Sequence, residues 1–273
     1  MAGSTVTRGV ILFAFNSEKF NYYDIAEFTA KRINHFLNLP VTLITDEESF
    51  SDTDYNWDKV IKVVPDKDNF REWGQWINKG RFMAYDLTPY EETMVLDVDY
   101  IVNSDKLLGV FDFYDDFCCH NRAEFLMMPD VPQEILSTYS YNSVWATVMA
   151  FKKTKRTEQI FRCMEMVQKN YKHYESIHNF IGSIYRNDYA LSLALRMVNG
   201  HTERKEDYIP WNLIHVGKKT FVYADSADEF NTSYTVLFDA WVRNKIKKEY
   251  ITVKDMDFHV LDKELFAEII NAT

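Results

Sequence analysis

The hydrophobic positions of the chain alternate between short apolar runs and longer stretches with helical spacing. Residues 9–16, GVILFAFN, form an apolar run rich in β-branched and aromatic side chains, which is typical of a strand buried on both faces. Residues 22–37 carry apolar side chains at helical spacing, and residues 39–46, LPVTLITD, return to strand character. Residues 58–65, DKVIKVVP, predict a third strand that ends at its proline. This alternation predicts an α/β fold with a mostly parallel sheet.

Further along the chain, the same two patterns continue. Residues 78–87 fit the continuation of a helix that begins near Trp73, and residues 93–102, TMVLDVDYIV, form the next apolar strand. The remaining predicted elements are a strand over 143–153, a helix over 157–174, a helix from Asn187 or Asp188 to Gly200, a strand over 220–225, a helix over 233–250 and a helix at the C-terminal end. The C-terminal part is therefore expected to be largely helical.

Composition favours one compact unit. The chain has 273 residues with 8 glycines and 6 prolines, and no Gly/Ser-rich or Pro-rich linker divides it. No run approaches the roughly 20 apolar residues of a membrane span, and the start has no signal-peptide layout. We therefore expect a soluble, cytoplasmic protein without a membrane partner. Its 3 cysteines do not form a disulfide framework, so reduced thiols are expected.

The charge balance limits the partners of the protein. A formal net charge of −10 argues against a surface that binds nucleic acid everywhere, because phosphate contacts need lysine and arginine. Two basic runs, KKTKR at 152–156 and RNKIKK at 243–248, could still supply local positive patches. Charge runs of this kind are more often solvated turns and helix faces.

Asp97 and Asp99 interrupt the apolar run ETMVLDVDYIV. A carboxylate buried in a sheet without a partner is very costly, so the pair indicates the end of a strand or a bound cation. The side chains of i and i+2 residues act together best where the strand bends into a turn. In a mostly parallel sheet, this position is at the ligand-binding edge.

Three interpretations of the pair remain open on these residues alone. Asp99 could cap a turn while Asp97 accepts backbone hydrogen bonds. The pair could be the nucleophile and the acid/base of a phosphatase-like site, with magnesium nearby. In the third interpretation, the pair holds a divalent metal that binds a nucleotide diphosphate, because hard cations take oxygen ligands and neutralise phosphate charge.

An apolar strand that ends in Leu96-Asp97-Val98-Asp99, about eighty residues after an N-terminal strand, resembles the Asp-X-Asp motif of GT-A glycosyltransferases. The resemblance implies a Rossmann-like, mostly parallel sheet flanked by helices, and a nucleotide-sugar, most simply a UDP-sugar, bound with Mn²⁺ or Mg²⁺. It also implies a single domain over 1–273, with a nucleotide-binding half at 1–105 and an acceptor half at 106–273 that includes a C-terminal metal-ligand segment.

The resemblance implies roles for residues around the motif. Asn16 follows the first strand, where the family contacts the nucleotide, and Asp46 after the second strand is a candidate nucleoside contact. Lys79 and Arg81, in NKGRF, stand where the family places a basic residue over the diphosphate. Asp97 is expected to bind the metal and to contact the ribose or the sugar as well.

Two later segments extend the resemblance. DFHVLDK resembles the late histidine of the family, so His259 is a candidate metal ligand beside Asp97 and Asp99, and Lys263 a candidate diphosphate contact. A lone histidine is also often a core residue. YRNDYALSLAL resembles the segment with an acidic residue beneath the sugar, so Asp188 is the candidate acid/base or nucleophile. Its alternative role is the N-cap of a helix.

Within this family, residues 78–102 resemble the short glycosyltransferases of tailed bacteriophages, some of which glycosylate hydroxymethylcytosine in DNA. This resemblance implies a DNA acceptor with a flipped base, reached through the two basic runs, in the cytoplasm of a host cell. A saccharide or protein acceptor, and a scaffold that binds a sugar nucleotide without turnover, remain alternatives. Inverting and retaining outcomes, the sugar and the oligomeric state stay open.

Overall fold

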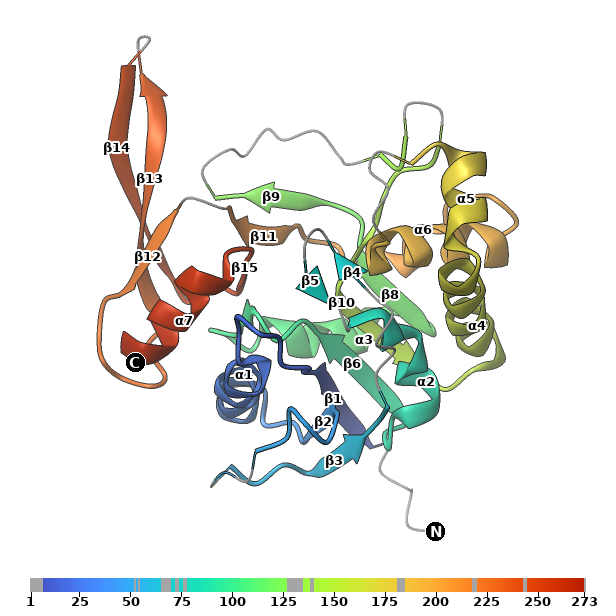
Figure 1. Ribbon diagram of the computed structural model, residues 1–273, viewed down its shortest axis with the longest axis horizontal. Helices are drawn as coiled ribbons and strands as arrows, with labels where there is room; N and C mark the ends of the chain where they lie inside the picture. Colours follow the sequence, from blue (N-terminus) through green and yellow to red (C-terminus); the bar gives the residue numbers. More distant parts are fainter. Residues whose placement is uncertain are drawn as a thin grey trace.

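A six-stranded sheet forms the centre of the protein (Figure 1). The computed structural model describes residues 7–51, 53, 55–64, 70–71, 74–75, 78–126, 135–137, 140–180, 185–217, 220–242 and 245–272. The sheet has the order β3-β2-β1-β6-β10-β8. Its strands are β1 (Arg8–Phe13), β2 (Val41–Thr45), β3 (Lys59–Lys62), β6 (Glu92–Leu96), β8 (Phe117–His120) and β10 (Trp145–Lys152).

The strand directions confirm the predicted class. Strands β3, β2, β1 and β6 are parallel to one another, whereas β10 runs antiparallel to both β6 and β8. The sheet is therefore mostly parallel and lies between helices, as the α/β, GT-A-like prediction requires. Because β2, β1 and β6 run in the same direction, their carboxyl ends meet at one edge.

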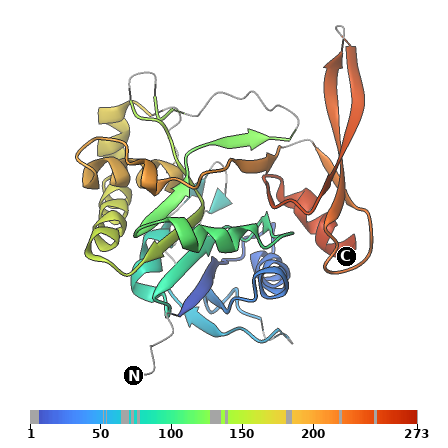
Figure 2. The same ribbon diagram turned by 180° about the vertical axis from the view of Figure 1, so that it is seen from behind.

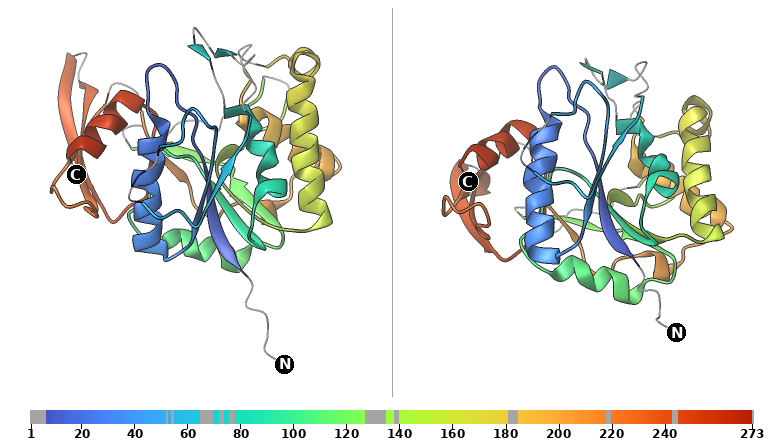
Figure 3. Two further views of the ribbon diagram at one scale, coloured as in Figure 1. Left: turned by 60° about the horizontal axis from the view of Figure 1, so that its bottom comes forward. Right: turned by 90° about the horizontal axis from the view of Figure 1, so that it is seen from below.

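Helices cover both faces of the sheet (Figure 3). They are α1 (Tyr22–Leu37), α2 (Ala84–Leu87), α3 (Val110–Phe113), α4 (Lys155–Lys169), α5 (Tyr171–His178), α6 (Asn187–Val198) and α7 (Lys263–Ala272), with 3-10 helices η1 (Asn78–Met83), η2 (Lys106–Gly109) and η3 (Lys205–Asp207). Along β1, Val10 and Leu12 join the core that α1 and α7 cover, and Ile11 and Phe13 join the core that α4 and α6 cover. This period of two explains why β1 is apolar at every position.

Local sequence signals fix the limits of α1. The side chain of Asn21 accepts hydrogen bonds from the backbone N–H groups of Tyr23 and Asp24, which satisfies donors that the first turn leaves free. The helix ends at Asn38, whose φ of 52° lies in the left-handed region that asparagine tolerates. Gly9 in β1 is needed for space, because a Cβ there would lie 2.3 Å from the ring of Tyr90.

Three smaller sheets complete the described fold. One has the order β7-β15-β11-β9, and another, β12-β13-β14, contains a long hairpin that projects from the body of the protein in both front and back views (Figures 1 and 2). The strands are β4 (Phe70–Arg71), β5 (Gly74–Gln75), β7 (Tyr100–Ile101), β9 (Ala123–Phe125), β11 (Leu213–Val216), β12 (Phe221–Ala224), β13 (Ser233–Val242), β14 (Lys245–Lys254) and β15 (Phe258–Val260).

The prediction of a helix over 233–250 is wrong, and so is that of a largely helical C-terminal part. This segment forms strands β13 and β14, which pair antiparallel over their full length. The side chains of Tyr234 and Val236 are buried on one face of the hairpin together with Val253, so the burial has a period of two. The β-branched and aromatic content of the segment suits a strand better than a helix. The strand over 220–225 and the terminal helix are confirmed as β12 and α7.

Two other predicted helices differ at their limits. The helix over 157–174 is divided at Asn170 into α4 and α5. The helix near Trp73 is described only from Asn78, where η1 leads into α2, and Trp73 itself lies outside the described residues. Helix α6 begins at Asn187, as predicted.

Candidate functional site

The two motif aspartates lie in a turn at the carboxyl edge of the parallel strands. Strand β6 ends at Leu96, and the backbone N–H of Tyr100 donates to the carbonyl of Asp97 at 3.1 Å. This hydrogen bond closes a turn over residues 97–100. Asp97 and Asp99 are therefore outside the strand, and the bend brings both carboxylates to the same side, as the spacing predicted.

His259 reaches the turn through a strand pairing that spans most of the sequence. Strand β15 pairs antiparallel with β7, which places His259 opposite Tyr100, and the N–H of Val260 donates to the carbonyl of Asp99 at 3.0 Å. His259 Nε2 lies 3.1 Å from Asp99 Oδ2 and 3.9 Å from Asp97 Oδ2. One ligand atom from each of the three residues lies within 4.8 Å of the others.

This donor set fits a divalent cation. Two atoms bound to one ion at about 2.0–2.2 Å lie up to about 4.4 Å apart, so small side-chain adjustments would suffice. Two carboxylates with one imidazole suit Mn²⁺, which accepts oxygen and nitrogen ligands together, and they also allow Mg²⁺. The Asp97 side chain is 20% exposed and that of Asp99 is 6% exposed, so Asp97 has more room for a second ligand.

Two cations balance the two carboxylates. Arg81, in η1, forms an ion pair with Asp97 and donates from Nη1 to the carbonyl of Ala146 at 2.6 Å. Lys263, the first residue of α7, contacts the carboxylate of Asp99. Lys79 lies in the same 3-10 helix as Arg81, and its side chain is outside the described residues. The formal charges of the four described groups cancel.

The surroundings shift the pKa values of the cluster. Burial alone would raise the pKa of Asp97, but the positive charges of Arg81 and Lys263 act in the opposite direction, and the pKa lies below its usual value. Burial also lowers the pKa of His259, against the opposing effect of the Asp97 and Asp188 carboxylates. Asp97 is therefore ionised and His259 neutral at pH 7, the forms in which both can bind a metal ion.

Asp188 does not cap helix α6. The N-cap position is Arg186, and Asp188 lies in the first helical turn. Its Oδ1 accepts from the backbone N–H of Ala146 in β10 at 2.8 Å, and its Oδ2 lies 2.9 Å from Arg186 Nη2. The N–H of Ala146 binds Asp188, and the carbonyl of Ala146 binds Arg81, which also pairs with Asp97. The backbone of Ala146 thus connects the two acidic residues through Arg81. The N-cap alternative is therefore wrong, and the acid/base role stays a prediction.

Strand β10 is irregular beside this connection. The pairing of β10 with β8 shifts register between Trp145 and Met149. Within that interval, the carbonyl of Thr147 accepts from the N–H of Asp97 at 2.9 Å. Bulges re-aim the backbone and are common beside functional sites. In this segment the carbonyl of Thr147 contacts Asp97, in continuation of the β10–β6 register, and the N–H of Ala146 contacts Asp188.

Asn16 and Asp46 lie at the same sheet edge, but their side chains hold loops. Asn16 Oδ1 accepts from the N–H of Tyr23 at 3.0 Å and so supports the start of α1. Asp46 Oδ1 accepts from the N–H of Ser49 at 2.7 Å in the loop after β2. Their position after β1 and β2 agrees with the nucleoside side of the site, and contact with a nucleotide stays a prediction.

The two basic runs are not part of this site. Strand β10 is antiparallel to β6, so Lys152 pairs with Glu92 at the end of β6 opposite Asp97. Arg156 in the same run lies 2.5 Å from Asp116 and 2.6 Å from Asp207, so its charge is compensated. The second run belongs to the tip of the projecting β13–β14 hairpin, although residues 243–244 are outside the described part (Figure 1). The two runs therefore do not border the Asp–Asp–His cluster, and their contact with a DNA acceptor stays a prediction.

Sequence reasoning missed three groups of the site. They are His215, whose ring lies beside His259, Arg186, which binds Asp188, and the backbone of Ala146. The sequence does carry a signal for the first, because LIHV and FHVL each place one histidine within an apolar strand. No local pattern indicates the other two, since both depend on how β10 meets α6.

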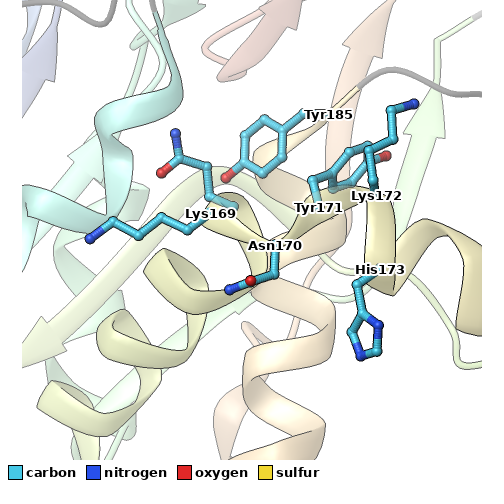
Figure 4. A pocket seen from close by; sticks show the side chains of 7 residues that line it. Lys169, Asn170, Tyr171, Lys172, His173 and Tyr185 are labelled. Carbon is cyan, nitrogen blue, oxygen red and sulfur yellow. The ribbon is translucent and has the colours of Figure 1, made fainter.

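A separate pocket lies where α4 meets α5, with a volume of about 460 Å³. Figure 4 shows the ring of Tyr185 beside the end of α4 and the start of α5. It is lined by Gln168, Lys169, Asn170, Tyr171, Lys172, His173 and Tyr185. None of the predicted site residues is among them. The pocket is therefore separate from the Asp–Asp–His cluster.

No protein-family model and no curated protein matches the chain. Among solved structures, that of the glycosyltransferase GlyE of Streptococcus pneumoniae TIGR4 matches 75% of this chain and 45% of its own, with 15% identity and a TM-score of 0.42. Its apo form matches 70% of this chain and 43% of its own, with 15% identity and a TM-score of 0.38. The chain thus spans less than half the length of GlyE. Within the described residues, no helix is long and apolar enough to cross a membrane.

Proposed function

We propose that the chain transfers a sugar from a nucleotide-sugar to a hydroxyl group and that it uses Mn²⁺ or Mg²⁺. The observation that carries this proposal is the cluster of Asp97, Asp99 and His259 at the carboxyl edge of the parallel strands, beside Arg81 and Lys263. Parallel sheets bind ligands at this edge. The cluster offers ligands for a divalent cation, and the two bordering cations are groups that bind phosphate oxygens. We take a UDP-sugar as the donor.

Each side of the site has a distinct proposed task. Asp97, Asp99 and His259 would hold the cation, which when bound would neutralise charge on the departing diphosphate. Arg81 and Lys263, together with Lys79, would bind the diphosphate oxygens, and Asp97 would also hold a ribose or sugar hydroxyl. Asn16 and Asp46 would border the nucleoside. Residues 1–105 would then bind most of the donor, and residues 106–273 of the same domain would bind the acceptor.

Asp188 is the proposed acid/base. Its carboxylate is held from two sides, by the Ala146 N–H and by Arg186, so its position is fixed before a substrate arrives. In an inverting reaction, Oδ2 would take the proton of the acceptor hydroxyl, and the Arg186 guanidinium would share that oxygen. In a retaining reaction, the same oxygen would face the anomeric carbon.

The proposed acceptor is a molecule with a free hydroxyl group. Hydroxymethylcytosine in DNA is the acceptor that the resemblance to phage enzymes implies, but neither basic run lies at the site to bind its phosphates. A saccharide or a protein acceptor requires no such patch. Mass spectrometry of nucleosides from hydroxymethylated DNA, treated with the protein and UDP-sugars, tests the DNA alternative. An unchanged mass removes it.

The donor half of the proposal is tested by incubating the protein with a panel of UDP-sugars, with and without Mn²⁺. We expect UDP release from at least one sugar nucleotide, only when the metal is present. The absence of both UDP release and a thermal shift with UDP and Mn²⁺ would contradict the proposal. A thermal shift without release would instead identify a non-catalytic binding protein, and phosphate release from a simple phosphoester would favour a phosphatase-like site.

A further inference from the structure

A second histidine lies behind the candidate metal ligand. His215 is on β11 and His259 on β15, and the parallel register of these strands places the two residues opposite each other. Their Nδ1 atoms are 3.0 Å apart, and the ring centroids are 5.0 Å apart. His215 is fully buried. The atom of His259 that faces the carboxylates is Nε2, so the two nitrogens of His259 have separate partners.

The environment of His215 holds its ring in place. The Trp145 ring lies 4.6 Å from the His215 ring in an edge contact, and the Phe125 ring lies 5.3 Å away. His215 Nε2 is buried without a hydrogen-bond partner in the described part of the chain. The Nδ1 contact with His259 is therefore the one hydrogen bond of this side chain among the described residues.

The Nδ1 to Nδ1 contact restricts where protons can be. His215 is fully buried against the rings of Trp145 and Phe125, an apolar environment that favours the neutral imidazole with one N–H. A hydrogen bond between two nitrogens needs one donor and one acceptor. When one ring carries its proton on Nδ1, the other must carry its proton on Nε2. The two rings thus hold opposite tautomers.

We propose that His215 is the positioning residue for His259: it orients the His259 ring and accepts a hydrogen bond from Nδ1–H when Nε2 serves as the metal ligand. Without metal, His259 Nε2–H can donate to Asp99, and His215 Nδ1–H donates to His259. For metal binding, His259 carries its proton on Nδ1 and His215 carries its own on Nε2. In the exchange, the Nδ1 proton moves from His215 to His259, the His259 Nε2 proton passes to water, and His215 Nε2 takes up one proton from water, so the pair holds two ring protons in both arrangements. The inference rests on the metal site proposed above.

The proposal predicts a specific effect on metal affinity. His215→Phe keeps an aromatic ring and removes the acceptor, and we expect the affinity for Mn²⁺ alone to fall by about 10- to 100-fold. His215→Asn places an amide oxygen near the position of Nδ1 and should retain most of the affinity. Electron paramagnetic resonance of free Mn²⁺ measures the binding without a substrate, and thermal unfolding reports the stability of each variant.

The matched control is His120→Phe. His120 is equally buried, its pKa is lowered by burial to about 3, and its ring nitrogens have no hydrogen-bond partner among the described residues. It therefore shares the burial of His215 but not the contact with His259. We expect this variant to keep wild-type Mn²⁺ affinity. The proposal would be overturned if His120→Phe lost as much Mn²⁺ affinity as His215→Phe. It would also be overturned if His215→Asn lost as much as His215→Phe.

Nitrogen-15 spectra of histidine-labelled protein provide a readout independent of metal affinity. Without metal, the ring signals of His215 and His259 should show one Nδ1–H and one Nε2–H tautomer, and Zn²⁺ should exchange them. Both rings in the same tautomer would overturn the proposal. If wild-type protein binds no Mn²⁺ but shows opposite tautomers without metal, the proposed metal site is wrong while the histidine pairing stands.

Discussion

The charged residues of the site compensate one another in pairs. Asp97 faces Arg81, Asp99 faces both Lys263 and His259, and Asp188 faces Arg186. A buried carboxylate without such a partner would be very costly. Asp99 is the deeper of the two motif residues, and it has the shortest contact with His259. It is therefore the residue on which metal binding should depend most.

Asp99→Asn should abolish metal-dependent turnover and leave the fold intact. The substitution removes the charge but almost no volume, so we expect UDP release to fall at least about 100-fold, the effect of losing several kcal/mol of charge stabilisation. Turnover with the UDP-sugar panel and thermal unfolding are the two measurements. Asp86→Asn is the control, since Asp86 pairs with Arg162 at the surface. Near-normal turnover of Asp99→Asn would show that the site is elsewhere.

At the scale of elements, the sequence was most informative where structure is local. The strand that ends before Asp97 and the turn around Asp99 follow from an apolar run interrupted by polar residues. The pairing of β15 with β7 brings His259 beside Tyr100, and no local pattern predicts such a distant contact. His259 was proposed through resemblance, and His215 was missed because its role depends on that pairing.

The β13–β14 hairpin shows a second limit of pattern reasoning. Tyr234, Leu237 and Phe238 follow the i, i+3, i+4 spacing of a helix, although the segment also fits alternation. The buried positions, Tyr234 and Val236, show a period of two only when the partner strand is known. Short apolar segments often fit both periods. The β-branched content was the better guide here.

Arg32 connects α1 to the segments after β7 and before β13, and its loss should destabilise the fold. The side chain is fully buried and donates to the carbonyls of Val102 at 2.9 Å, Glu229 at 2.7 Å and Asn231 at 2.7 Å. Arg32→Met would leave these buried acceptors unpaired. We therefore expect the free energy of unfolding to fall by about 3 kcal/mol or more.

Urea unfolding measures this loss. Arg162→Met is the matched control, because Arg162 makes its ion pair with Asp86 at the surface and should leave the unfolding midpoint nearly unchanged. Equal midpoints for the two variants would show that the Arg32 hydrogen bonds contribute little.

At the scale of the whole molecule, the cluster is balanced in charge although the chain as a whole is acidic. The chain carries a formal net charge of −10, whereas the two motif carboxylates are compensated by Arg81 and Lys263. A divalent cation would add positive charge to this compensated cluster. The negative charge of a diphosphate would then restore the balance. Metal and nucleotide are therefore expected to favour each other.

This expectation is a linkage prediction. The affinity for Mn²⁺ should rise about 5- to 150-fold when UDP is present, and the affinity for UDP should rise by the same factor when Mn²⁺ is present. Calorimetric titrations in both orders measure the two factors. Uridine, which lacks the diphosphate, is the matched control and should not change the Mn²⁺ affinity. Independent binding of Mn²⁺ and UDP would contradict this account of the charges.

The most direct test of the central claim is anomalous diffraction from crystals of the protein grown with UDP and Mn²⁺. The account predicts a manganese peak bounded by Asp99, His259 Nε2 and Asp97, with the diphosphate on its open side. Metal–ligand distances of about 2.0–2.2 Å to the first two residues are expected. Manganese bound elsewhere, or UDP bound away from this edge of the sheet, would contradict it.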